Sequence, residues 1–195
     1  MSLFSLEGPL YKISKLIYTL LTLNFLCFIF SIPIITMGTS ITALFYVTGK
    51  IIRGENYYLF KDFWKSFWLN LRQGIMIFLL FTAGFYLILV NIRSVNILGL
   101  SKIFIWLQYL ILFELTAGII VIFPLLARYH FKSWSGIKFA FFLVNRHLIT
   151  AILAVAVLPA LFGLVYWQPV FLLFIIAIYG FWINLLWQSK FVYHK

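Results

Sequence analysis

Apolar runs long enough to cross a membrane recur along the whole of this chain. An α-helix rises about 1.5 Å per residue, so roughly 20 apolar residues span the hydrocarbon core of a bilayer. The polar stretches between the runs are too short to form a water-soluble domain. The pattern predicts an all-α, polytopic membrane protein with about six transmembrane helices, at residues 16–35, 38–52, 74–92, 103–127, 148–166 and 170–187.

The overall composition agrees with this interpretation. Apolar residues make up 65% of the chain and charged residues only 10%. A water-soluble domain carries about a quarter of its residues as charged side chains, because its surface faces water. We therefore expect residues 1–195 to form a single membrane domain that is surrounded by lipid.

A predicted hinge precedes the second and shortest apolar run. Pro33 has no backbone N–H and disfavours helix at the preceding residue, so the first span is expected to kink or end there, with Gly38 close behind. Residues 38–52 reach only roughly 20–25 Å as a helix, which suits either a short tilted span or a re-entrant helix. A helix break is the simplest interpretation of the hinge, and a broken helix that lines a binding site is the alternative.

Residues 59–73 are predicted to form an amphipathic helix at the membrane interface. Its apolar face repeats at helical spacing through Phe60, Phe63, Trp64, Phe67, Trp68 and Leu71. Its basic residues lie off that face: Lys61, Lys65 and Arg72. A second basic segment, residues 133–147, carries Lys138 and Arg146. Both segments are expected to anchor the chain at the lipid surface, and docking of a cytoplasmic partner is the alternative.

The distribution of basic residues predicts the topology. Fifteen Lys and Arg against four acids give a net charge of +11. If residues 38–52 cross the membrane, 13 basic residues lie inside and two, Arg93 and Lys102, lie outside; if they do not cross, the division is 11 to four. We therefore predict six spans with both termini in the cytoplasm. The partners of the basic segments are then the anionic head groups of the lipid bilayer, and not nucleic acid.

Three polar residues lie deep inside predicted spans and are candidates for a ligand-binding site. Glu114 lies near the middle of its span, where an ionised carboxylate costs several kcal/mol, so it is expected to face other helices or a wet cavity. Asn24 and Asn184 are its candidate partners. Together they suggest a site for a proton or a hydroxyl-bearing ligand, or, as the alternative, hydrogen bonds that only hold helices together.

Motifs for catalysis or cofactor binding are absent from the sequence. It contains no phosphate-binding loop, nucleophile elbow, paired carboxylates or His-Glu-x-x-His motif, and its one cysteine, Cys27, lies in an apolar run. We expect no enzymatic activity, no cofactor and no metal ion.

Three motifs in the first half of the chain carry a family resemblance. They are Ser-Ile-Pro-Ile-Ile-Thr-Met-Gly at 31–38, Thr-Ala-Leu-Phe-Tyr-Val-Thr at 42–48 and Phe-Lys-Asp-Phe-Trp-Lys-Ser-Phe at 60–67. With these motifs the chain resembles the YesL-type family of bacterial integral membrane proteins, a domain of unknown function. The resemblance implies a bacterial cell-membrane location. It also implies a link to carbohydrate uptake, because such genes often lie beside ABC-type sugar transporters. It supplies no catalytic residues.

These observations lead to two main hypotheses. The first is an accessory or regulatory subunit that is associated with a carbohydrate transporter of the ABC type through helix contacts. The alternative is an independent small transporter or channel that uses the polar residues inside the membrane, with a lipid-interacting structural protein as a third option. The sequence leaves a homo-oligomer open.

Overall fold

The described part of the chain is helical throughout. The structure is a computed structural model that describes residues 9–97, 102–129, 133–188 and 190. Its elements are α1 (Pro9–Phe30), η1 (Ile34–Thr36), α2 (Met37–Ile52), α3 (Leu59–Ile97), α4 (Lys102–Arg128), α5 (Ser133–Arg146), α6 (Leu148–Trp167), η2 (Pro169–Phe171) and α7 (Leu172–Trp187). No strand occurs among these residues, so the predicted all-α fold is confirmed.

Six helical segments in the described residues are long and apolar enough to cross a membrane. They are Ile13–Phe30, Ile34–Ile52, Leu59–Val95, Ile103–Arg128, Leu148–Trp167 and Pro169–Trp187. These segments correspond in order to the six predicted spans. The remaining helix, α5, has only 14 residues, as expected of a segment that does not span the bilayer. The fold is therefore that of a multi-pass helical membrane protein.

The chain breaks between α1 and α2 as Pro33 predicts. α1 ends at Phe30, earlier than the predicted boundary at residue 35, and a single 3₁₀ turn follows Pro33. Thr36 closes the break, because its Oγ1 lies 2.7 Å from the carbonyl oxygens of both Phe30 and Pro33. Gly38 is not part of this break. It lies in the first turn of α2, is buried, and has no positive φ.

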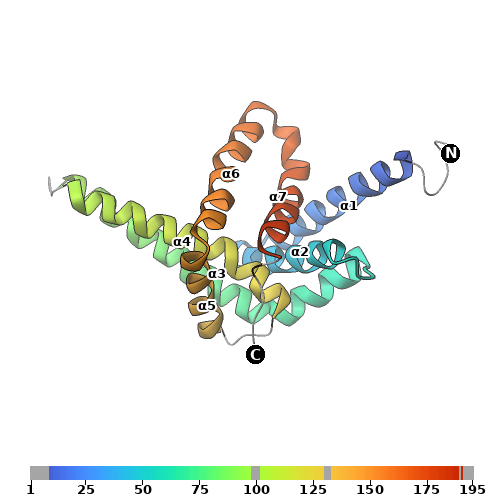
Figure 1. The fold of residues 1–195 in the computed structure, drawn as a ribbon, viewed down its shortest axis with the longest axis horizontal. Helices are drawn as coiled ribbons and strands as arrows, with labels where there is room; N and C mark the ends of the chain where they lie inside the picture. Colours follow the sequence, from blue (N-terminus) through green and yellow to red (C-terminus); the bar gives the residue numbers. More distant parts are fainter. Residues whose placement is uncertain (1–8, 98–101, 130–132, 189, 191–195) are drawn as a thin grey trace.

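Residues 59–73 do not form a separate helix. They are the first part of α3, which continues without interruption to Ile97 and has 39 residues, about 58 Å of helix. The predicted boundary at Gly74 followed a change in polarity, but polarity does not interrupt backbone hydrogen bonds. A glycine inside a helix costs only about 1 kcal/mol. Figure 1 shows that the two halves of α3 run in different directions.

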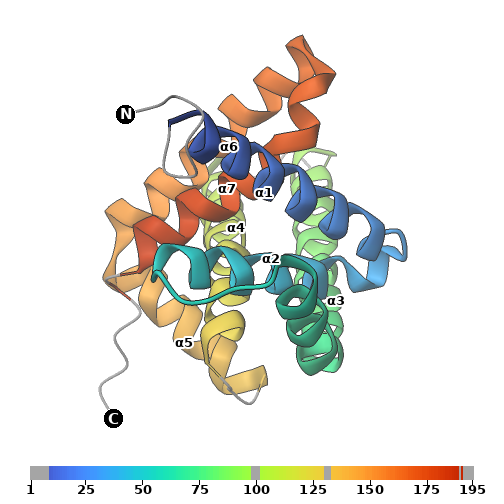
Figure 2. The ribbon, with the colours of Figure 1, turned by 90° about the vertical axis from the view of Figure 1, so that its right-hand side faces the viewer.

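α2 is the central helix of the fold. It packs against α1, α3, α4 and α7, and Figure 2 shows it near the middle of the molecule. It lies antiparallel to the first half of α3: Lys50 meets Asp62 at one end, and Gly38 meets Gly74 at the other. That residues 38–52 cross the membrane while residues 59–73 lie at its interface stays a prediction.

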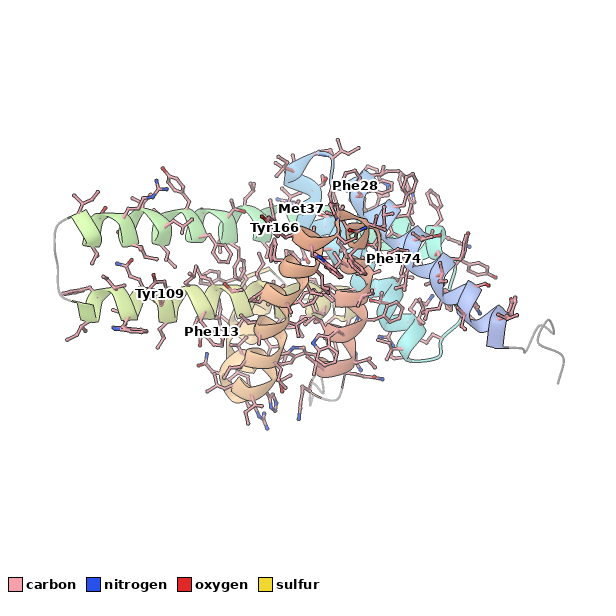
Figure 3. The ribbon with its side chains drawn as sticks, turned by 90° about the horizontal axis from the view of Figure 1, so that it is seen from above. Phe28, Met37, Tyr109, Phe113, Tyr166 and Phe174 are labelled. Carbon is pink, nitrogen blue, oxygen red and sulfur yellow. The ribbon has the colours of Figure 1, made fainter. Side chains whose placement is uncertain are left out.

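Two helical hairpins project from this centre. The last part of α3 and the first part of α4 form the α3–α4 arm, and α6 with the first part of α7 forms the α6–α7 arm (Figure 1). Figure 3 shows α3 and α4 side by side in their arm, with Tyr109 and Phe113 on α4. Buried side chains concentrate instead in α2, in the second half of α4 and in α5. The arms therefore expose large apolar surfaces.

Candidate functional site

Asn24 connects α1 to the beginning of α7. It is buried, and its Oδ1 accepts hydrogen bonds from the backbone N–H groups of Ile176, at 3.1 Å, and Ala177, at 3.3 Å. Its Nδ2 donates to the Leu20 carbonyl oxygen within α1, at 2.8 Å. The side-chain amide thus uses both of its ends on backbone groups. This arrangement holds two helices together and leaves little of the amide to bind a ligand.

Asn184 makes an equivalent connection between α7 and α2. Its Nδ2 donates to Thr48 Oγ1 at 2.7 Å and to the Phe45 carbonyl oxygen at 3.1 Å. The two helices approach closely here because Gly180 lies against Leu44, where an added methyl group would overlap the leucine side chain. Small residues at a helix crossing permit such polar contacts in membrane proteins.

The hydrogen-bond partner of Glu114 is neither of the two asparagines that were predicted for it. The Oε2 of Glu114 accepts a hydrogen bond from Asn145 Nδ2 at 3.3 Å, which joins α4 to α5. The three polar residues therefore connect three different helix pairs: α1–α7, α2–α7 and α4–α5. The described residues do not assemble them into one polar site, and their geometry favours the packing interpretation. Asn145 was not among the predicted site residues.

The aromatic face of residues 59–73 divides into buried and exposed parts. Phe63 and Phe67 are 0% and 5% exposed and pack against Phe30 with ring centroids 5.6 Å and 4.9 Å apart. Trp64 and Trp68 remain 41% and 54% exposed. Only the two tryptophans, and Phe60 stacked on Trp64, are thus available for lipid or a partner. Periodicity identified the apolar face, but it did not show that α1 covers half of it.

The predicted basic residues lie on the surface of α3 and α5. Lys61, Lys65 and Arg72 of α3 and Lys138 and Arg146 of α5 are all exposed. Three of them lie over aromatic rings: Lys61 over Tyr58, Lys138 over Trp134 and Arg146 over Phe142. Basic groups held above aromatic rings are typical of a membrane interface.

The ion pair between Lys50 and Asp62 is a structural contact that sequence reasoning did not identify. Lys50 Nζ lies 2.9 Å from Asp62 Oδ2, and the backbone N–H of Tyr58 donates to the same oxygen at 2.8 Å. Both side chains are mostly buried. A weak signal was present in the sequence, because Asp62 is the only acid in its helix and Lys50 lies in the last turn of the preceding helix. A spacing of 12 residues, however, predicts no contact.

Apolar grooves surround the first half of α7. A cavity of about 500 Å³ lies between α1 and α7, and its lining residues are Tyr18, Leu21, Thr22, Asn24, Phe25, Phe28, Leu172, Leu173 and Ile176. A second cavity of about 460 Å³ continues past Phe28 towards Met37 and Ile41. A third, of about 260 Å³, lies between α6 and α7 and reaches Tyr179. These surfaces suit apolar occupants, such as lipid chains or helices.

Groups of side chains suited to hold a metal ion do not occur in the described residues. The carboxylates there are Glu55, Asp62 and Glu114. Glu55 pairs with Arg53 at 2.6 Å, Asp62 with Lys50, and Glu114 with Asn145. Each of these three carboxylates therefore takes part in a structural contact.

Comparison with known proteins finds a match to one family model over part of the chain. Residues 19–92 match a family model that is described as a protein of unknown function, DUF624. The match covers the second half of α1, all of α2 and most of α3. It supports neither the narrower YesL-type name nor a link to carbohydrate transport. No curated protein and no solved structure matches the chain.

Proposed function

We propose that this chain is a non-enzymatic accessory subunit of a membrane complex, and that it packs against transmembrane helices of a partner protein. The open groove between α1 and α7 carries this proposal. Its walls are almost wholly apolar, and Phe25 and Phe28 remain 65% and 59% exposed. Without a hydrophobic driving force between helices in lipid, association depends on close packing, which a preformed groove provides.

The length of the groove suits a helix as its occupant. Together with the cavity beyond Phe28, it follows α1 from Tyr18 to the end of the helix at Phe30 and continues to Ile32. The helical part of this stretch, residues 18–30, corresponds to about 18 Å of helix, which is more than half of the roughly 30 Å hydrocarbon core. A single helix of a partner can therefore lie in contact with α1 along most of the membrane.

The alternative, an independent transporter, finds less support. A transporter needs polar groups that converge on a path through the membrane. Asn24, Asn184 and Glu114 instead hydrogen bond within three separate helix pairs. Their positions suit a protein whose helices are held firmly in place.

The proposed partner is a carbohydrate transporter of the ABC type in a bacterial cell membrane. This part of the proposal rests on the sequence resemblance alone. The proposed orientation, with both termini in the cytoplasm, rests on the charge distribution. An N-terminal tag that is accessible from outside intact cells would contradict that orientation.

Site-specific photo-crosslinking tests the accessory role. A benzophenone amino acid replaces Phe25, which lines the groove, in cells that express the transporter. Phe104, which is 52% exposed on the α3–α4 arm and does not line the groove, serves as the matched control position. The expected product joins position 25, but not position 104, to a membrane-spanning subunit of the transporter.

Three other outcomes would contradict the proposal. A product of twice 22.9 kDa at position 25 indicates self-association. Crosslinks to lipid alone indicate that the groove holds acyl chains. Equal crosslinking to the transporter from both positions indicates random contact in the membrane.

A further inference from the structure

We propose that the corner between α5 and α6 is a binding site for the phosphate head group of an anionic phospholipid. A cavity of about 460 Å³ opens at this corner and shares no lining residue with the apolar grooves. Its lining residues are Asn145, Arg146, His147, Leu148, Ile149, Thr150 and Lys190. The inference does not depend on the proposed transporter partner.

Cationic groups from two separate elements meet at this cavity. Arg146 ends α5, and Lys190 follows α7. His147 lines the same cavity, and its ring lies 6.3 Å from the ring of Trp187, the last residue of α7. Partial burial, together with the charges of Lys190 and Arg146, lowers the pKa of His147. The lowered pKa favours the neutral imidazole, which can donate one hydrogen bond without adding to the repulsion between the two cations.

No carboxylate in the described residues balances these two cations. The three acids there pair with Arg53, Lys50 and Asn145. Arg146 contacts an aromatic ring, with its guanidinium carbon 5.9 Å from the centre of Phe142. The cavity thus has an excess of positive charge that an external anion can neutralise.

The backbone at the corner adds hydrogen-bond donors. His147 precedes α6, and its side chain makes no capping hydrogen bond to that helix. The first N–H groups of a helix have no partner within the helix and favour a negative charge nearby. These donors come from Leu148, Ile149 and Thr150, which also line the cavity.

Exposed apolar side chains beside the cavity favour a lipid over a free phosphate ion. Leu148 and Ile149 are 46% and 78% exposed, and Ile152, one turn further along α6, is 52% exposed. A phosphate group at the cations therefore lies next to a surface on which acyl chains can pack. Basic pockets beside transmembrane helices bind anionic head groups in this way.

Native mass spectrometry of the purified full chain tests the site. The probes are phosphatidylglycerol, phosphatidylcholine and inorganic phosphate. We expect phosphatidylglycerol to bind and the other two to bind at least tenfold more weakly. The double variant Arg146→Gln/Lys190→Gln should bind phosphatidylglycerol roughly 20–30-fold more weakly, from about 1 kcal/mol for each cation near an anionic lipid.

A matched double variant separates a specific site from general attraction. Lys15→Gln/Arg93→Gln removes the same charge from exposed positions of α1 and α3 and should retain most of the binding. Equal losses in both double variants would overturn the proposal, because the lipid would then respond only to net charge. Inorganic phosphate that binds as tightly as the lipid would overturn it too.

Ile149→Asn tests the proposed acyl-chain surface. This variant should weaken binding of the lipid and leave binding of phosphate unchanged. An unchanged lipid affinity would count against the proposed acyl-chain surface. The thermal stability of each variant in detergent shows whether it is folded.

Discussion

The contact between Gly38 and Gly74 provides the sharpest test of the fold. A methyl group added at Gly74 would lie 2.5 Å from Thr39 Oγ1 and 2.9 Å from Thr39 Cα. A methyl group added at Gly38 would lie 2.7 Å from the Gly74 carbonyl oxygen. Both clashes involve backbone atoms, which cannot rotate away as a flexible side chain can. Relief requires α2 and α3 to move apart.

Gly163 of α6 provides the matched control. It lies inside a helix, and nothing is found within 4 Å of a methyl group added there. Alanine in place of glycine inside a helix stabilises it by about 0.5–1 kcal/mol, so Gly163→Ala should be neutral or slightly stabilising. At Gly74 the same gain is opposed by overpacking, which costs about 1–3 kcal/mol in a packed core and more against backbone. We expect Gly74→Ala to lower the free energy of unfolding by about 1–2 kcal/mol.

The assay is equilibrium unfolding of the purified chain in mixed micelles, followed by tryptophan fluorescence. The seven tryptophans of the chain supply the signal. Gly74→Ala and Gly38→Ala should both unfold at lower denaturing-detergent fractions than the wild type, while Gly163→Ala should not. If Gly74→Ala is as stable as Gly163→Ala, the close crossing of α2 and α3 is refuted.

Three further predictions concern polar contacts. Asn24→Leu should weaken the α1–α7 contact and lower the free energy of unfolding by about 0.5–1.5 kcal/mol, the range for a hydrogen bond between membrane helices. An unchanged unfolding curve would contradict the hydrogen bonds from Ile176 and Ala177 to Asn24. Lys50→Met leaves the mostly buried Asp62 unpaired and should cost about 1–3 kcal/mol, and Lys50→Met/Asp62→Asn should recover part of that loss in the same assay. The hydrogen bond from Arg53 holds the pKa of Glu55 below its ordinary value of 4.5, so this pair contributes stability above that pH and loses it as the pH falls. The difference in melting temperature between wild type and Arg53→Gln should therefore be largest near pH 7 and vanish well below pH 4.5; a constant difference would exclude the pair as its cause.

The α-helical structure of the chain and the number of its candidate spans could be predicted from local chemistry. A run of about 20 apolar residues has to satisfy its own backbone hydrogen bonds in lipid, and a helix does so within one segment. Pro33 marked the break after α1 for an equally local reason, since it lacks a backbone donor. By contrast, the boundary expected at Gly74 followed side-chain polarity alone, and α3 runs through it.

The arrangement of the site residues could not be predicted in the same way. Glu114 and Asn24 each needed a partner, because an unpaired polar group is costly inside a membrane. Which partner each one finds depends on how the helices cross, and the chain order does not specify this. Phe63 and Phe67 illustrate the same limit, since periodicity placed them on the face they share with Trp64 and could not show that Phe30 covers them.

The sequence by itself therefore determined that this chain forms membrane helices, where the first of them breaks, and which residues lie on one helical face. These properties depend on neighbours within a few residues of one another. The tertiary structure alone decided that α2 lies at the centre, that Asn24, Asn184 and Glu114 serve separate helix pairs, and that Arg146 and Lys190 line one cavity. These contacts join residues far apart in the chain, and they form only where the shapes of small and large side chains allow two particular helices to approach.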